Sequence, residues 1–152
     1  MANSAGICTS FKVALLNGLH AFGASVIRAA TTKDDFKAAL FLASASRGAG
    51  DTVYNTTGEV SGTNYTAGGV AVTTATAPNS TGTTAFVTPS ASIVFTNVTL
   101  AAAFDAMLIY NDTSASKLAV QVLTFGSQTI TAGTLTFTMP TNDATTGLLR
   151  MA

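Results

Sequence analysis

The sequence predicts a mainly β protein, an antiparallel β-sandwich of the jelly-roll or immunoglobulin-like kind, with one short helix near the N-terminus. From residue 51 onward, short runs rich in Thr, Val, Ile, Phe and Tyr are separated by clusters of Gly, Asn, Asp and Ser at intervals of about ten residues. Across residues 134–139, apolar side chains alternate with threonine, so one face of a strand there is core and the other is solvated. We expect residues 1–152 to form a single β-rich domain, because one domain typically spans about 100 to 200 residues.

The helical segment is predicted over residues 10–20. Ser10, or the threonine before it, can cap the first turn. Apolar side chains then recur at the four-residue spacing of one helix face, at Phe11, Leu15 and Leu19.

The first strand is predicted after Asp34 and Asp35, over residues 36–43. This apolar run is consistent with either a buried strand or a short helix. We favour a strand, because residues rich in serine and glycine follow directly and interrupt a helix.

The remaining strands are predicted over residues 70–76, 83–88, 92–99, 104–110, 118–125 and 134–139. Residues 78–82, which begin with a proline, are predicted to form a turn. The polar residues between Tyr110 and Leu118 are typical of a hairpin connection. Ala132-Gly133 fits a tight turn in which the glycine takes a positive φ.

Charge is scarce in this chain. Only 9% of the residues are charged and the formal net charge is zero, against about 25% charged residues in an average protein. This composition indicates neither a nucleic-acid partner nor an anionic membrane. The longest apolar stretches, such as residues 101–110, are about half the roughly 20 residues that span a bilayer, so no transmembrane helix is expected. No basic region of a secretory signal is present at the start, so we expect synthesis in a cytoplasm.

A surface with so few charges must be covered by Thr, Ser, Asn and Gly. Threonine suits the solvent face of a strand, because its β-branch stiffens the side chain and its hydroxyl can bond to water. Such a face carries no charge that would repel an added strand, and near-neutral surfaces favour association. We therefore expect a homo-oligomer or another assembled state.

Few residues suggest catalysis or metal binding. Cys8, His20 and an acidic residue could in principle form a nucleophilic triad, although His20 fits better as a residue stabilised at the end of a helix. The carboxylates are scattered apart from Asp34-Asp35, which fits the start of a strand better than an acid/base pair. Asp112 could contribute to an irregular calcium site. We expect no enzyme activity, no cofactor and no metal.

Several segments together resemble a family of small β-rich virion structural proteins of tailed bacteriophages. The resemblance covers nearly the whole chain and is carried by residues 10–22, 54–69, 108–112, 119–126, 140–145 and 148–151. It implies a β-rich component of the particle rather than an enzyme, and it contributes no catalytic residues. Members of the family often place a tryptophan in the strand near residues 92–99, where this chain has Ser-Ile-Val-Phe.

The resemblance and the uncharged surface lead to one main functional hypothesis and two alternatives. The main one is a capsid cement or decoration protein of the virion, whose partners are the major capsid protein or other virion proteins. The alternatives are a tail or tail-fibre component and a carbohydrate-binding sandwich for host attachment, which needs exposed aromatic rings. The candidate contact residues lie in the helix and in the loop-rich stretch that follows residue 51: Phe11, Leu15, Leu19, Tyr54 and Tyr65.

Overall fold

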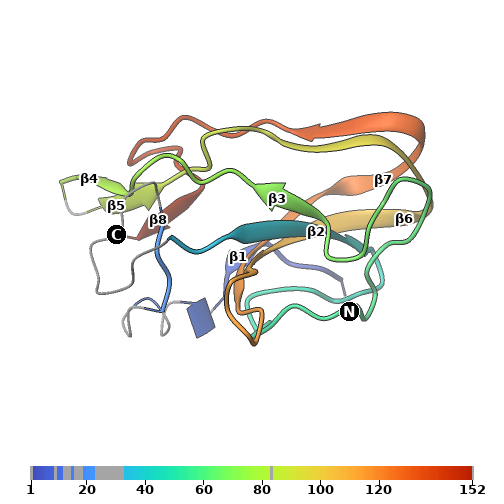
Figure 1. The fold of residues 1–152 in the computed structure, drawn as a ribbon, viewed down its shortest axis with the longest axis horizontal. Coiled ribbons are helices and arrows are strands. Elements are labelled where there is room, and N and C mark those ends of the chain that lie inside the picture. Colours follow the sequence, from blue (N-terminus) through green and yellow to red (C-terminus); the bar gives the residue numbers. More distant parts are fainter. Residues whose placement is uncertain are drawn as a thin grey trace.

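The computed structural model describes residues 2–8, 10–11, 15, 19–22, 33–82 and 84–151, whose strands form two antiparallel sheets (Figure 1). The larger sheet has the order β1-β7-β6-β2-β3, comprising β1 (Gly6–Ile7), β7 (Ala119–Phe137), β6 (Ile93–Asn111), β2 (Phe36–Leu42) and β3 (Val70–Val72). The smaller sheet has the order β4-β5-β8, comprising β4 (Asn79–Thr81), β5 (Thr84–Val87) and β8 (Leu149–Met151). The mainly β prediction is confirmed.

Strand β2 lies at the centre of the core. It pairs with β6 along its whole length and with β3 over its first three residues. Successive side chains of a strand point to opposite faces, yet residues 38–41 are all 0% exposed. Both faces of β2 are therefore covered, which explains its nearly continuous apolar sequence and confirms a strand rather than a helix.

Strands β6 and β7 are each 19 residues long and pair with one another as one long ribbon. Sequence analysis divided each of them into two shorter strands, and that division is wrong. Figure 1 shows the ribbon turning at the right of the view and returning along the top, so that residues 93–100 and 130–137 form a folded-over half. Ring contacts hold the two halves together. The ring centroids of Phe125 and Phe137, which lie in opposite halves of β7, are 5.1 Å apart.

Irregular pairing within the ribbon explains why the expected turn at Ala132-Gly133 is absent. Val98 pairs with Gly133 whereas Leu100 pairs with Ile130, so β7 carries one extra residue at this point. Ala132, rather than the glycine, takes the positive φ of 46°. A bulge absorbs an extra residue and bends the ribbon without ending the strand.

Two other turn predictions have different outcomes. The turn predicted over residues 78–82 is misplaced, because Asn79–Thr81 is strand β4 and the positive φ of 59° falls at Gly82. The hairpin connection between Tyr110 and Leu118 is confirmed, since it joins β6 to β7.

The helix predicted over residues 10–20 is not confirmed. Residues 12–14 and 16–18 lie outside the described residues, and Leu19 and His20 are described but are not helical; among the described residues of this range, Ser10, Phe11 and Leu15 have helical conformation. Within the described residues, no helix is long and apolar enough to span a membrane.

Candidate functional site

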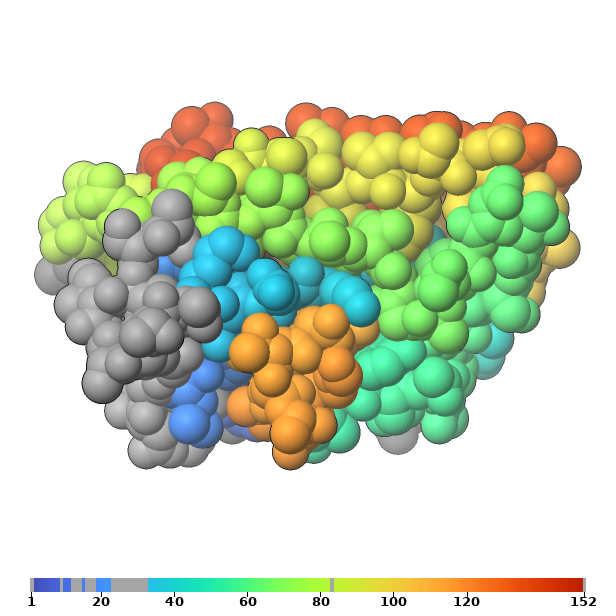
Figure 2. All heavy atoms as spheres, viewed as in Figure 1, coloured from blue at the N-terminus to red at the C-terminus, as the bar shows by residue number. Residues whose placement is uncertain are grey.

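Charged residues are distributed unevenly along the chain, which leaves one large part of the surface uncharged. Residues 60–104 and 118–142 contain no Asp, Glu, Lys or Arg, and these two stretches include β3, β4, β5 and β7 entirely and β6 up to its midpoint. In Figure 2 the yellow residues of β6 and the orange-red residues of β7 run side by side along the upper edge of the molecule. The folded-over half of the ribbon is therefore an uncharged surface.

Threonine covers the solvent face of this half of the ribbon. Thr134, Thr136 and Thr138 are exposed, while Leu135 and Phe137 between them are half-buried, so the predicted alternation is confirmed. Thr134 Oγ1 accepts a hydrogen bond from the backbone N–H of Asn97 at 3.3 Å. The threonines thus provide a neutral face and also bond to backbone groups that the irregular register leaves free.

The outer edge of β7 is open over most of its length. Strand β1 pairs with β7 only at Gln121 and Val122, and no other strand of the described residues pairs with that edge through residues 123–137. The edge of β6 on the side away from β7 is partly covered, because Thr99 N–H donates to Thr63 O at 3.1 Å and Asn64 Nδ2 donates to Asn97 O at 2.8 Å. An open, uncharged edge of this length is a template for an added strand.

Tyr54 and Tyr65, predicted as contact residues, converge on one carboxylate. Glu59 accepts hydrogen bonds from Tyr54 Oη at 2.6 Å, from Tyr65 Oη at 2.7 Å and from the backbone N–H of Gly68 at 2.7 Å. Tyr65 Oη also accepts the N–H of Leu40 at 3.0 Å, which fastens the loop to β2. Burial, reinforced by the hydrogen bonds to Glu59, raises the pKa of both tyrosine hydroxyls above the ordinary value.

The aromatic rings offer no exposed platform. The ring of Tyr54 stacks on Tyr110 at 4.4 Å, and Tyr110 Oη donates to Gly68 O at 2.8 Å. All the phenylalanines and tyrosines of the chain lie within the described residues, and each is buried or half-buried. This placement weighs against a carbohydrate-binding surface, which needs exposed rings.

His20 is a buried residue packed among aromatic rings. It is 7% exposed and contacts Phe11, with ring centroids 4.8 Å apart. Asn111 Nδ2 lies 3.2 Å from His20 Nδ1 and donates to Asp34 Oδ2 at 3.0 Å, so His20 and Asp34 share one amide from β6. The sequence suggested neither this cluster nor the role of Asn111, because its members are far apart in the chain.

The Cys8 thiol is poorly suited to act as a nucleophile. Its side chain is fully buried and its Sγ faces the carbonyl oxygen of Gly48 at 4.0 Å. Burial, together with the nearby charge of Asp51, raises the pKa of the Cys8 thiol to about 11. A thiol with this pKa is protonated at neutral pH, and the thiolate is the reactive form.

Asp112 is held by two lysines. Its carboxylate oxygens pair with Lys117 Nζ and with Lys37 Nζ, the latter at 3.0 Å, and the hydrogen bond from Lys117 is the main cause that lowers the pKa of Asp112. Both carboxylate oxygens of Asp112 therefore already have cationic partners. Within the described part of the chain, no group of three or more His, Cys, Asp and Glu side chains could hold a metal.

Arg47 is a buried cation that sequence analysis did not single out. Its guanidinium lies 4.0 Å above the ring of Phe41, pairs with Asp51 at 3.1 Å and donates to Thr57 O at 2.7 Å. These contacts fix the loop that precedes residue 58. No local sequence pattern distinguishes Arg47 from a surface arginine, because its contacts with Asp51 and Thr57 form only when the following loop is folded.

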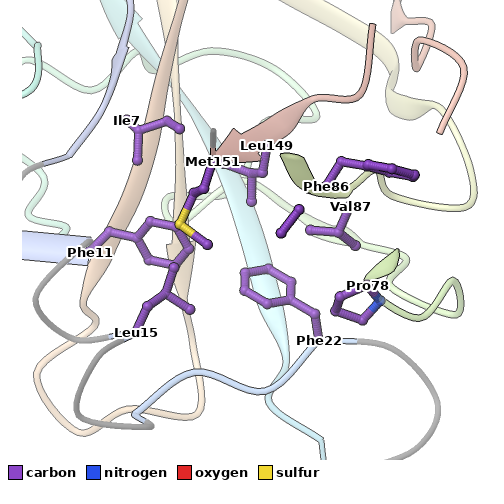
Figure 3. A pocket seen from close by; sticks show the side chains of 10 residues that line it. Ile7, Phe11, Leu15, Phe22, Pro78, Phe86, Val87, Leu149 and Met151 are labelled. Carbon is purple, nitrogen blue, oxygen red and sulfur yellow. The ribbon is translucent and has the colours of Figure 1, made fainter. Parts of the chain in front are cut away.

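Figure 3 shows an apolar pocket of about 100 Å³ where the N-terminal segment meets the smaller sheet. Phe11 and Leu15 line it from one side, facing Leu149 and Met151 of β8. Phe11 is 2% exposed and belongs to the core, whereas Leu19 is 51% exposed. Of the predicted contact residues, Phe11 and Leu15 thus lie at this pocket and Tyr54 and Tyr65 lie at Glu59, whereas Leu19 belongs to neither group.

Comparison with known proteins gives no relatives: no family model, no curated protein and no solved structure matches the chain.

Proposed function

We propose that the protein is a structural component of a tailed-bacteriophage particle, a cement or decoration protein that binds the capsid shell. The observation that carries this proposal is the uncharged, threonine-covered half of the β6–β7 ribbon. The resemblance of several segments to virion structural proteins supports it. We also propose that the ribbon, folded over β2, forms a β-sandwich of the jelly-roll or immunoglobulin-like kind.

The mechanism of such a protein is adhesive. Each copy contributes a neutral face that meets no electrostatic barrier. Many copies bound at once resist displacement far better than one weak contact, because each further contact forms within an existing assembly. The partners are the major capsid protein or other virion proteins, and the protein reaches the virion after synthesis in the cytoplasm of the host bacterium.

The copy number of the chain in purified particles tests this proposal. Isotope-labelled peptides of this protein and of the major capsid protein allow both to be quantified in the same digest. A cement protein is expected at a copy number comparable to that of the major capsid protein. A tail component is instead present in the few copies that the rotational symmetry of the tail requires. Absence from the particle contradicts a virion role altogether.

A further inference from the structure

We propose that the outer edge of β7 pairs with the same edge of a second copy, antiparallel and across a twofold axis. The inference goes beyond the proposed function and does not depend on it, because self-association is a property of the isolated chain. It follows from the length of the open edge, from the absence of charge along it and from the side chains that line it.

The strands at the other ends of the two sheets are much shorter than the open edge of β7. Strands β1, β3, β4 and β8 end their sheets, but each has only two or three residues. Very short edge strands are one of the ways in which proteins prevent unwanted pairing. The edge of β7 over residues 123–137 is several times longer and carries neither a lysine nor a proline that would block an added strand.

The open edge of β7 carries no charge that would oppose pairing with an identical edge. In an antiparallel pair across a twofold axis, residues near the axis lie opposite their own copies, so any charge there faces a like charge. Residues 118–142 contain no charged side chain, so self-pairing meets no such repulsion. A different partner is commonly selected by complementary charge, which this edge does not offer. A second copy is therefore the occupant that the edge fits best.

Self-pairing of this edge covers apolar surface and ends at a dimer. Leu135, Phe137 and Met139 are half-buried within one chain and retain apolar surface beside the open edge. Pairing joins the folded-over halves of two copies into one four-stranded layer and covers part of that surface. Because each copy uses the same edge, no equivalent edge is left for a third copy, and the assembly closes as a dimer.

Sedimentation of the full-length chain over a concentration series tests the proposal. The wild-type protein is expected to show a monomer–dimer equilibrium. Thr136→Lys places a cation on the edge strand and is expected to raise the dissociation constant at least about tenfold, a change of about 1.4 kcal/mol. Thr96→Lys is the matched control, because Thr96 is also exposed but lies on β6 and not on the outer edge of β7. Circular dichroism of both variants verifies that they remain folded.

Cross-linking provides a second measurement that does not depend on lysine variants. The native cysteine is buried, so cysteines introduced by Thr134→Cys or Thr136→Cys are the accessible thiols within the described residues. A short bismaleimide is expected to link the edge variants into dimers more efficiently than it links Thr96→Cys. A wild-type chain that stays monomeric at every concentration overturns the inference, as does a dimer that Thr136→Lys and Thr96→Lys affect equally. A monomer that still binds capsids leaves the proposed function intact while it overturns this inference.

Discussion

Replacing Glu59 by glutamine tests whether the loop of residues 54–69 is fastened by one carboxylate. Glutamine keeps the size of the side chain, but it has one acceptor oxygen and presents an NH₂ group where the carboxylate accepted a hydrogen bond. Glu59 accepts from Tyr54, Tyr65 and Gly68 at 2.6 to 2.7 Å. One of these hydrogen bonds must reverse or break, and the others lose their charged acceptor.

The expected loss in the free energy of unfolding follows from these contacts. A hydrogen bond to a charged group contributes about 1.5–3 kcal/mol and one to a neutral group about 1 kcal/mol. Glu59 is half-buried, so solvent offsets part of the loss. We expect Glu59→Gln to lower the free energy of unfolding by about 2–3 kcal/mol. For a domain of this size, that corresponds to a fall in Tm of about 4–12 °C.

Urea unfolding followed by circular dichroism and tyrosine fluorescence measures the change, since the chain contains no tryptophan. Asp35→Asn is the control, because the side chain of Asp35 is 79% exposed and its pairing with Lys33 is expected to contribute less than about 1 kcal/mol. Tyr65→Phe, alone and combined with Glu59→Gln, should show a coupling energy above about 0.5 kcal/mol. The reasoning is refuted if Glu59→Gln is no more destabilising than Asp35→Asn, or if its effect adds simply to that of Tyr65→Phe.

Three further predictions concern other parts of the fold. Gly62→Ala places a Cβ 1.9 Å from Thr99 O and should destabilise the protein by about 1–3 kcal/mol. The control Gly50→Ala places a Cβ with no atom within 4 Å and should be nearly neutral. Equal effects of the two variants in urea unfolding would contradict this prediction. The Cys8 thiol, with its pKa raised to about 11 by burial, should react with a disulfide reagent at neutral pH only when the chain unfolds, and rapid labelling of the folded protein would disprove its burial. Burial also raises the pKa of the Tyr110 hydroxyl to about 12, so the stability associated with it is complete below about pH 10 and is lost as the pH rises from about 10 toward 12. Ultraviolet absorbance of the phenolate should therefore rise together with alkaline unfolding, and a rise centred near pH 10 in a folded chain would be inconsistent with this.

Local patterns predicted the strands but not how far they continue. The alternation across residues 134–139 and the apolar run of β2 are visible in the sequence, because the period of the side chains reports which face is covered. The continuity of β6 and β7 is not visible in the sequence, because Ala132-Gly133 has the composition of a turn. These residues form a bulge within β7 because of how β7 pairs with β6.

The surroundings of the candidate residues could not be predicted for a related reason. Tyr54 and Tyr65 stand in a stretch with the composition of a loop, which suggests exposure. Their burial depends on Glu59, on the ring of Tyr110 and on the N–H of Leu40. Contacts between distant parts of a chain are fixed by tertiary packing, and a single sequence carries no periodic signal for them. The absence of charge along the ribbon, in contrast, is visible in the sequence itself. The open edge of β7, which makes this absence relevant to pairing, is visible only in the structure.

The central claim is that the open edge of β7 is an assembly surface, and hydrogen exchange of the backbone amides at low and at high protein concentration tests it most directly. Exchange across residues 130–137 is expected to slow as the concentration rises, because outward N–H groups of the edge gain partners. Residues 104–111 of β6 provide the internal reference, since they already lie between β2 and β7 and should exchange at the same rate under both conditions. Rates across residues 130–137 that do not change with concentration, in a protein whose dimer is populated, would contradict the claim.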